Sequence, residues 1–509
     1  MGANSNLYAL LEQRFIEAGD QPAFSLPGRA GFSYAGLLER VGRFANALRE
    51  LGVRPDDRVT VQVEKSLNNV ALYLAVMKVG AVYQPLNTAY TTAEVDYFVG
   101  DAEPRLIVTD PVRRAPMDDL ADKHGVPAVE TLDAQGEGSL AELAASMPVA
   151  AETTHRGPDD LAGLLYTSGT TGRSKGAMLT HRNLSSNALT LKDLWAFAPG
   201  DVLLHALPIF HVHGLYVALN TAFLNRSEII WLDKFDADQV IAQLPRATLM
   251  MGVPTFYTRL LGHAGFSQDV CGNMRLFISG SAPLLADTHR QFEAVTGHKI
   301  LERYGMTECG MITSNPYDGE RVPGTVGFPL PEVSVRIVDG EGRPVAPGEV
   351  GMLETNGPNR FKGYWRMPEK TAEEIRPDGF FITGDLASMD EEGRVTIVGR
   401  GKDLIISGGF NVYPKEVESE LDQLPGVRES AVIGVPHPDF GEAVVAVVTS
   451  LPNVVIAEPE VIERLAQRLA KFKVPKRVIQ IGELPRNTMG KVQKAELRKQ
   501  YGDLFSTVA

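Results

Sequence analysis

Cysteine is nearly absent from this chain of 509 residues, which contains only Cys271 and Cys309. Two cysteines form neither a disulfide framework nor the paired spacing of a zinc site. A secretory signal is also missing, because the opening stretch "MGANSNLYALLEQRF" has no apolar core flanked by basic residues. Position 6 is Asn, where a myristoylation signal needs Ser or Thr. We therefore expect a cytoplasmic protein.

A membrane span and an excess of positive charge are lacking as well. The long apolar run over residues 202–225 contains one Pro and three His and is typical of a buried core. The formal net charge of -13 argues against a general affinity for nucleic acid. One segment differs: residues 464–477, "RLAQRLAKFKVPKR", carry six basic and no acidic side chains. A solvated helix face and a surface for a phosphorylated ligand both remain open for it.

Length and pattern predict several domains built from alternating helices and strands. About 150 residues per domain would give roughly three units. Residues 34–51 have apolar positions at helical spacing, residues 57–63 read as a strand, and residues 69–80 as a helix ending at Gly. Such alternation predicts an α/β fold with a largely parallel sheet.

After about residue 320 the pattern changes to short strands separated by Gly and Pro, which predicts an antiparallel subdomain. Residues 390–409 then indicate a hairpin running into a polar, Gly-bounded connection. We place a domain boundary there, so that residues 1–400 form a large N-terminal domain. Residues 401–509 are expected to form a small α+β domain.

The stretch that follows the apolar strand pattern "LAGLLY" is chemically the most informative. Residues 167–176, "TSGTTGRSKG", combine glycines, hydroxyls and a lysine, and bury little apolar surface. Exposed backbone amides with hydroxyls and a lysine suit the oxygens of a polyphosphate. The loop is not a Walker A motif, because Lys175 is followed by Gly. On this stretch alone, a flexible surface loop remains the alternative.

The extended stretch "YTSGTTGRSKG" resembles the signature of the adenylate-forming superfamily, which includes acyl-CoA synthetases, peptide-synthetase adenylation domains and firefly luciferase. The similarity continues in order through "RYGMTE" at 303–308, "TGD" at 383–385, "GRGKDLIISGGFNVYPKEVE" at 399–418 and "PRNTMGK" at 485–491. It implies layered αβαβα sheets with a distorted antiparallel β subdomain, followed by a small mobile C-terminal domain. It also implies ATP and coenzyme A as co-substrates and Mg²⁺ as cofactor.

The same resemblance implies roles for residues around ATP. Glu308 would hold Mg²⁺, Thr307 would contact the α-phosphate, and Tyr304 would pack on the adenine. Asp385, with Arg400 nearby, would bind the ribose hydroxyls. The triphosphate would lie on a loop formed by Thr167, Ser168, Gly169, Thr170, Thr171, Gly172 and Lys175.

Residues of the C-terminal part take the remaining roles that the resemblance implies. Lys491 would touch the carboxylate and the α-phosphate together, and Lys402 would be the hinge. Gly408, Gly409 and Phe410 would meet coenzyme A after the domain has turned. In related enzymes the lysine of this setting is reversibly acetylated, so an acetyltransferase and a deacetylase are implied partners. Acetylation would remove the charge that the first half-reaction needs.

Substrate choice is expected in the segment "MGVPTFYTRLL", which places Arg259 one helical turn after Thr255. From spacing alone, Arg259 is an exposed helix residue. This segment and "SGSAPL" resemble malonyl-CoA synthetases, which implies that Arg259 and Ser281 bind a distal carboxylate. Met306 would limit the acid to malonate or methylmalonate, and His211 would orient or gate the substrate carboxylate. His211 and His213 are a weak metal pair, with no Cys or carboxylate cluster nearby.

The sequence therefore predicts a ligase that joins malonate or methylmalonate to coenzyme A through an acyl-adenylate. Alternatives are the adenylation of another short acid, the loading of a carrier protein, a luciferase-like oxidoreductase and a non-enzymatic nucleotide sensor. A sensor is expected to lose Lys491 or Glu308, and both are present. A luciferase-like enzyme would need room for a bulky aromatic substrate, which Arg259 argues against.

Overall fold

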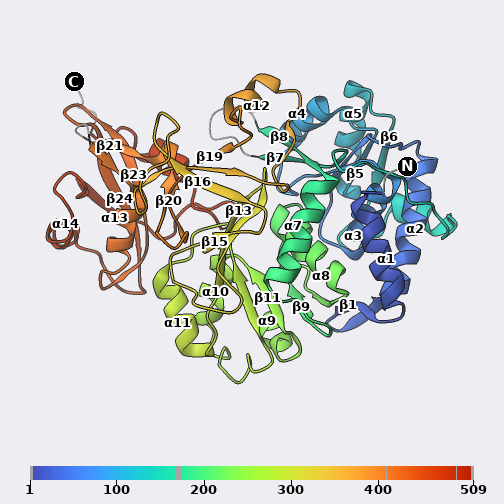
Figure 1. The fold of residues 1–509 in the computed structure, drawn as a ribbon, viewed down its shortest axis with the longest axis horizontal. Helices are drawn as coiled ribbons and strands as arrows, with labels where there is room; N and C mark the ends of the chain where they lie inside the picture. The colour runs from blue at the N-terminus through green and yellow to red at the C-terminus, as the bar shows by residue number, and fades with distance from the viewer. Residues whose placement is uncertain (1–3, 168–173, 408–409, 489, 506–509) are drawn as a thin grey trace.

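The computed structural model describes residues 4–167, 174–407, 410–488 and 490–505. The N-terminal part of the chain contains two large, mostly parallel sheets (Figure 1). In the first sheet the order is β18-β8-β7-β4-β3-β5-β6, and only β8 and β18 run antiparallel to their neighbours. Its strands are β3 Arg58–Gln62, β4 Val82–Pro85, β5 Leu106–Thr109, β6 Ala128–Thr131, β7 Leu161–Thr167, β8 Lys175–Thr180 and β18 Gly363–Tyr364.

The second sheet has nine strands in the order β15-β14-β13-β12-β11-β9-β10-β1-β2. Its six central strands are parallel, and antiparallel strands close both edges. The strands are β1 Pro22–Leu26, β2 Arg29–Ser33, β9 Val202–His205, β10 Glu228–Trp231, β11 Leu249–Gly252, β12 Leu276–Ser279, β13 Leu301–Met306, β14 Gly310–Ser314 and β15 Phe328–Pro329.

Helices pack against both sheets of this domain. The α-helices are α1 Leu7–Ala18, α2 Tyr34–Glu50, α3 Leu67–Val79, α4 Thr92–Ala102, α5 Arg114–His124, α6 Ser139–Ser146, α7 His181–Leu194, α8 Asn220–Asn225, α9 Ala237–Gln243, α10 Pro254–Leu261, α11 Ala286–Thr296 and α12 Pro368–Glu374. Short turns of other helix types are η1 Pro111–Arg113, η2 His213–Leu219 and η3 Leu244–Arg246.

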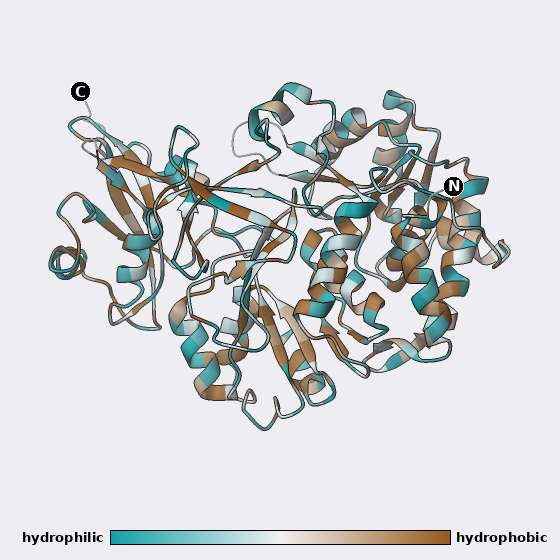
Figure 2. Ribbon diagram, viewed as in Figure 1, coloured by the Kyte–Doolittle hydropathy of each residue, from teal (hydrophilic) through white to brown (hydrophobic). Residues whose placement is uncertain are grey.

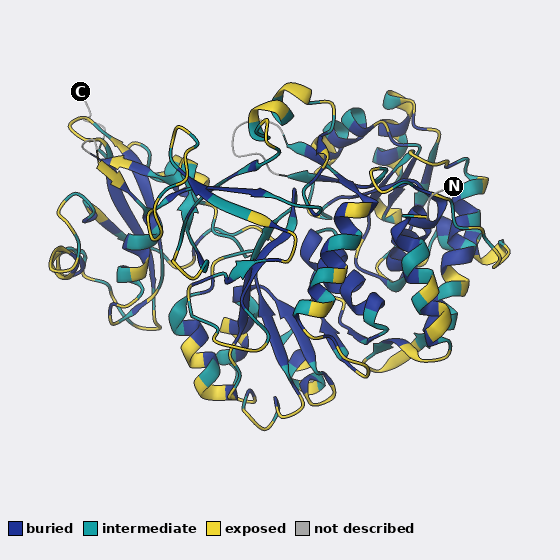
Figure 3. Cartoon of the chain, in the orientation of Figure 1, coloured by how far each residue is buried: buried dark blue, intermediate teal, exposed yellow. Residues whose placement is uncertain are grey.

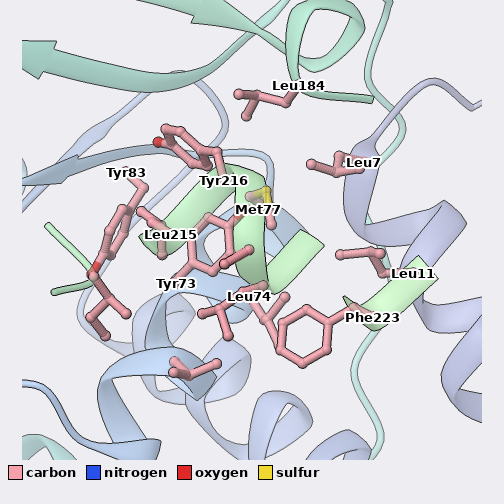
Figure 4. Close-up of a cluster of buried hydrophobic side chains, with 14 of the residues drawn as sticks. Leu7, Leu11, Tyr73, Leu74, Met77, Tyr83, Leu184, Leu215, Tyr216 and Phe223 are labelled. Atoms are coloured by element: carbon pink, nitrogen blue, oxygen red, sulfur yellow. The ribbon is translucent and has the colours of Figure 1, made fainter. Parts of the chain in front are cut away.

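The core of this domain lies around α3, which is buried at every position from Asn69 to Val79. A helix that is apolar on all sides is stable only when other layers cover all of it. Its side chains share one cluster with residues of both large sheets. Figure 4 shows Tyr73, Leu74 and Met77 of α3 among side chains of α1, η2 and α8. The helix ends at Gly80 with φ 83°, as the sequence pattern predicted, and it starts at the Ser66 cap, a little before the predicted residue 69.

An antiparallel sheet follows, in the order β16-β17-β19-β20. Its strands are β16 Ser334–Val338, β17 Gly351–Asn356, β19 Phe381–Met389 and β20 Val395–Arg400. The predicted domain boundary lies where β20 ends and the turn η4, Gly401–Asp403, begins. The antiparallel subdomain and the hairpin expected from the sequence are therefore present.

The C-terminal part forms a separate α+β unit around a five-stranded sheet (Figure 1). The middle parts of its two longest strands, Val427–His437 and Gly441–Ser450, are buried, while much of the polar surface lies on its helices and loops (Figures 2 and 3). The expected fold class, α/β with a large N-terminal and a small C-terminal domain, is confirmed. The elements are β21 Ile405–Ser407, β22 Phe410–Val412, α13 Pro414–Leu421, β23 Val427–His437, β24 Gly441–Ser450, α14 Glu458–Ala466, β25 Arg477–Gln480 and α15 Lys494–Tyr501.

The basic stretch at 464–477 is mostly not helical, because α14 ends at Ala466. The interpretation as a solvated helix face is therefore wrong for most of its length. Three of its cations pair with carboxylates: Arg468 with Glu420, Lys473 with Glu416 and Arg477 with Glu458. Among the described residues, no helix has both the length and the apolar character needed to cross a bilayer.

Candidate active site

The predicted phosphate loop joins β7 to β8, whose end residues Thr167 and Lys175 lie opposite each other in the sheet. The Tyr97 hydroxyl donates to the Ser174 carbonyl over 2.8 Å, which fixes the second end of the loop. Two antiparallel strands thus hold both ends of a segment with few packing side chains of its own. The remaining loop residues predicted to contact ATP, Ser168, Gly169, Thr170, Thr171 and Gly172, lie outside the described residues.

Two side chains, those of Tyr364 and Glu374, connect the lysine of this loop to the predicted magnesium ligand, Glu308. Lys175 Nζ lies 2.9 Å from Glu374 Oε1 and 4.2 Å from the centre of the Tyr364 ring. The Tyr364 hydroxyl lies 2.6 Å from Glu374 Oε2 and 3.1 Å from Glu308 Oε1, and both distances allow it to donate. We call Lys175, Tyr364, Glu374 and Glu308 the phosphate-end network.

Glu308 is the buried acid of this network, with 5% of its surface exposed. Burial raises the pKa of its carboxyl above the ordinary value, because the charged form loses water. Within the described residues, no group of three or more His, Cys, Asp or Glu could hold a metal ion. A single carboxylate still fits Mg²⁺, which is commonly bound by one or two carboxylates together with substrate phosphates. Thr307, the residue before it, lines a small cavity with Val212 and Tyr216.

Tyr304, Asp385 and Arg400 lie together, in agreement with the site that the resemblance implies. The Tyr304 hydroxyl donates to Asp385 Oδ2 over 2.5 Å, and Arg400 Nε lies 2.9 Å from Asp385 Oδ1. The pairing of β19 with β20 places Asp385 opposite Arg400. Burial disfavours the charged guanidinium, but Asp385 raises the pKa of Arg400 above its ordinary value. This arrangement gives an acidic side chain a defined orientation.

The loop that carries Lys491 docks on the N-terminal domain. The Asn87 amide donates to the Thr488 hydroxyl over 3.3 Å, and a Cβ added at Gly490 would lie 2.9 Å from Thr255 Oγ1. Gly490 has φ 72°, so both its conformation and its close approach favour glycine. Burial and, to a smaller extent, the nearby Arg400 lower the pKa of Lys491 to about 8, while Asp385 opposes this shift. Lys491 therefore lies within electrostatic reach of the Asp385 and Arg400 pair.

The predicted hinge, Lys402, lies in η4 directly after β20. Its neighbour Asp403 pairs with Arg498 of α15 over 2.6 Å, which ties the hinge turn to the C-terminal domain. Phe410 is 56% exposed and stacks on Phe472 at 4.7 Å between ring centres. The other two predicted coenzyme A residues, Gly408 and Gly409, lie outside the described residues.

The predicted acyl end is formed by η2, the turn after β12, and the end of β13. Ser281 Oγ lies 3.2 Å from His213 Nδ1, and Ser281 has φ 71°, a conformation that costs energy for a residue with a side chain. Burial lowers the pKa of His211 to about 4, so its imidazole is neutral at pH 7. Met306 is partly buried at the end of β13. The hydroxyl of Ser281 and the imidazole of His213 are therefore side by side.

The two arginines near this end differ sharply. Arg259 lies on the last turn of α10 and is exposed. Arg303, which precedes Tyr304 in β13, is 3% exposed, and its Nε and Nη2 atoms have no hydrogen-bond partner among the described residues. Its guanidinium lies against Gly280, where an added Cβ would be 2.3 Å from Nη1. Burial lowers the pKa of Arg303 to about 9.

Sequence reasoning missed three residues of the site: Arg303, Tyr364 and Glu374. Arg303 belongs to the quoted motif "RYGMTE", and its position one residue before Tyr304 in a buried strand was the available signal. An arginine at a core-facing strand position needs an anion, because burying an unpaired charge is costly. Tyr364 and Glu374 fall in "GYWRMPEKTAEE", where only the three-dimensional structure brings them to Lys175.

Comparison with known proteins gives a consistent result. The AMP-binding enzyme family model matches residues 11–365, and the model of the AMP-binding enzyme C-terminal domain matches residues 416–491. A feruloyl-CoA synthase of Amycolatopsis sp is 37% identical, covering 93% of this chain and 95% of the relative. The mitochondrial malonate–CoA ligase ACSF3 of Mus musculus is 36% identical, covering 89% of this chain and 83% of the relative.

Solved structures of MatB from Rhodopseudomonas palustris are similar over nearly the whole chain. The ATP-bound form is 57% identical, with a TM-score of 0.96, and covers 99% of this chain and 100% of that chain. The apo form has the same identity and the same coverage, but a TM-score of 0.84. The present structure is therefore more similar to the ATP-bound form than to the apo form.

Proposed function

The chain belongs to the AMP-binding enzyme family, and we propose from this premise that it joins malonate or methylmalonate to coenzyme A. It is an AMP-forming acid–thiol ligase, and the reaction proceeds through an acyl-adenylate. The acid, ATP and coenzyme A are its substrates, and AMP and pyrophosphate leave as products. The preference between malonate and its methyl derivative is part of the proposal.

One observation carries the choice of a diacid: the unpaired, buried guanidinium of Arg303. A buried cation without a partner destabilises the free protein and attracts an anion of matching size. Its neighbour Gly280 precedes Ser281, so the second carboxylate of a short diacid can meet a guanidinium and a hydroxyl together. Arg259, exposed on α10, remains a second candidate for the same carboxylate.

The feruloyl-CoA synthase and the malonate–CoA ligase ACSF3 are about equally similar to this chain in sequence. The polarity of the acyl end favours a short diacid over ferulate as the substrate. A long aromatic acid is held by an enclosed apolar pocket, where an unpaired arginine would lose its water without gaining a partner. Met306 and the neutral His211 and His213 leave a short, polar end. A carrier protein in place of coenzyme A remains the alternative acceptor.

The first half-reaction joins two anions, so the protein must mainly neutralise and align charge. An oxygen of the proximal carboxylate attacks the α-phosphorus, and the bond to pyrophosphate breaks. Lys491 neutralises charge on the carboxylate and the α-phosphate, while Lys175 and the loop before it hold the leaving pyrophosphate. Asp385 holds the ribose and Tyr304 packs on the adenine. His211 orients the reacting carboxylate as a neutral hydrogen-bonding group.

Mg²⁺ is proposed as cofactor, held by Glu308 together with phosphate oxygens, where it would neutralise phosphate charge. Burial keeps Glu308 short of partners until a cation arrives, since Tyr364 is its side-chain contact in the phosphate-end network. The proposal of Mg²⁺ at this position rests on the chemistry of the Glu308 carboxylate alone.

In the second half-reaction the thiol sulfur of coenzyme A attacks the acyl carbon, the bond to AMP breaks, and the thiol proton is lost. We place the hinge at Lys402 and the arriving face at Gly408, Gly409 and Phe410. The exposure of Phe410 in the present arrangement supports a second arrangement in which it is covered. A cavity of about 240 Å³, lined by Phe210, Phe256 and Thr488 among others, is the proposed route for the thiol arm.

The test compares Arg303→Met with Arg259→Met and with the charge-preserving Arg303→Lys. AMP release is measured with malonate, methylmalonate, succinate, acetate and butyrate. We expect Arg303→Met to lose about 100-fold in kcat/KM for malonate, the size expected when one partner of a buried charge pair is removed. Its activity with acetate or butyrate should stay at or above that of the wild type.

Thermal unfolding separates this effect from misfolding. Removing an unpaired buried charge should leave the Tm unchanged or raise it, whereas the loss of a structural ion pair would lower it. Malonate should raise the Tm of the wild type and of Arg259→Met, but not that of Arg303→Met. Full malonate activity in Arg303→Met would assign the second carboxylate elsewhere. Wild-type turnover of acetate or ferulate in preference to malonate would remove the diacid proposal itself.

Reversible acetylation of Lys491 by an acetyltransferase and a deacetylase is proposed as regulation. The modification would remove the positive charge on which adenylation depends. Mass spectrometry of the protein from cells with an active acetyltransferase tests this, and an unmodified Lys491 would contradict it.

A further inference from the structure

Glu374, at the end of α12, belongs to the phosphate-end network but has no role in the reaction steps proposed above, although its carboxylate pairs with Lys175. From the geometry of the phosphate-end network we infer that Glu374 is a positioning residue for ATP, which acts by holding Lys175 in place for the triphosphate. This inference rests on the proposed function, because it assumes that Lys175 binds ATP.

The position of Glu374 is defined by several contacts rather than by a single surface ion pair. Its Oε2 accepts from the Tyr364 hydroxyl over 2.6 Å, and Tyr364 is 2% exposed. Its Oε1 lies 2.9 Å from Lys175 Nζ and 3.2 Å from Lys370 Nζ. The Tyr364 backbone N–H donates to the Thr371 hydroxyl, which fixes α12 against β18. A carboxylate held in this way can orient a flexible lysine.

Lys175 is accordingly restrained from two directions. One side of its ammonium group faces Glu374, and another faces the Tyr364 ring at 4.2 Å. An ammonium group has three N–H donors, so donors remain for phosphate oxygens. The pairing of β18 with β8 brings Tyr364 opposite Ala177, two residues after Lys175 on the same face of the strand. Restraint of this kind lowers the entropy lost when the lysine binds an anion.

The same carboxylate also connects Lys175 to Glu308. The Tyr364 hydroxyl has one proton, and it lies 2.6 Å from Glu374 and 3.1 Å from Glu308. The shorter contact assigns the hydroxyl proton to the hydrogen bond with Glu374. The Tyr364 hydroxyl therefore competes only weakly with a cation for the Glu308 carboxylate. Burial opposes ionisation, but Lys175, Tyr364 and Lys370 hold the pKa of Glu374 below its ordinary value. Glu374 is therefore charged at pH 7, so it can pair with Lys175 and accept the hydrogen bond from Tyr364.

The experiment measures ATP binding by titration calorimetry and the KM for MgATP in the malonate reaction. Variants are Glu374→Ala, Glu374→Gln, Lys175→Ala and the double variant Glu374→Ala with Lys175→Ala. Glu373→Ala is the matched control, because Glu373 contacts Lys370 but not Lys175. We expect Glu374→Ala to raise the Kd and the KM for ATP about ten-fold, the size of one charge-assisted contact, with little change in the KM for malonate.

Two comparisons distinguish positioning from a general structural role. In the Lys175→Ala background, Glu374→Ala should have almost no further effect on ATP, because its partner is gone. Glu374→Gln should lose less ATP affinity than Glu374→Ala, since its amide oxygen still accepts from Lys175 although the negative charge is gone. Unchanged or tighter ATP binding in Glu374→Ala would overturn the inference, as would an equal loss in both backgrounds. A wild-type protein without malonate-dependent AMP release would instead contradict the proposed function.

Discussion

The phosphate end and the acyl end of the site differ in how their charges are paired. At the phosphate end, Lys175 pairs with Glu374 and Arg400 pairs with Asp385. At the acyl end, Arg303 has two guanidinium nitrogens without a partner among the described residues, and the Nε2 atoms of His211 and His213 also have none. At the phosphate end these two cations are paired with carboxylates, whereas at the acyl end several buried nitrogen atoms have no hydrogen-bond partner among the described residues.

This difference has a physical meaning. ATP arrives with many charges and can be received by pre-oriented groups that already satisfy one another. A short diacid brings one distal carboxylate, and an unpaired buried cation binds it more strongly than a cation already neutralised by the protein. The cost of leaving Arg303 unpaired is a loss of stability in the free protein, as is common at binding sites. Substitutions at the two ends should therefore have different consequences.

The largest effect is expected for Lys491→Ala, which acts at the phosphate end on every acid. Removing the cation that meets the developing charge should reduce pyrophosphate exchange roughly 100- to 1,000-fold. The loss should be the same for malonate and for acetate, unlike that of Arg303→Met. Nucleotide titration should show ATP binding largely retained. Undiminished exchange would remove Lys491 from the mechanism, and a loss confined to diacids would erase the distinction between the two ends.

A pH dependence of intermediate size should also arise at the phosphate end. Burial and the nearby Arg400 lower the pKa of Lys491 to about 8, so the ammonium form is present below this pH and is lost above it. The kcat/KM for adenylation should therefore fall as the pH rises through about 8. Lys491→Arg keeps its charge to higher pH and should shift this decline upward, even at a lower rate. An identical alkaline decline in both proteins would assign it to another group.

The smallest effect is expected for the Ser281 hydroxyl at the acyl end. Its loss should raise the KM for malonate about five-fold, or ~1 kcal/mol, because Arg303 still provides the charge. Ser281→Ala and Ser281→Gly form a matched pair, since glycine tolerates the φ of 71° whereas alanine does not. If the two variants have equal KM values but Ser281→Ala has the lower Tm, the rise in KM is due to the lost hydroxyl and the fall in Tm to the strained backbone. A rise in KM for alanine alone would show that the backbone conformation matters instead.

Much of the fold could be predicted locally. The helices at 34–50 and 67–79 and the strand at 58–62 follow from apolar periodicity, caps and glycine. The antiparallel subdomain follows from the change to short strands and turn residues, and the domain boundary after Arg400 stays a prediction. For the basic stretch at 464–477, one of the two open interpretations, a solvated helix face, was wrong for most of its length, because composition alone does not show where α14 ends.

The sequence by itself determined the family, and its ordered motifs predicted the phosphate loop and chemistry-bearing groups such as Glu308, Asp385 and Lys491. Only the tertiary structure decided which charges are paired. Lys175 and Glu374 are almost 200 positions apart, and they meet because β18 is added to the edge of the first sheet. Arg303 and Arg259 are the same residue type, and packing alone made one buried and the other exposed. Burial and pairing depend on neighbours distant in the chain, which a local pattern cannot specify.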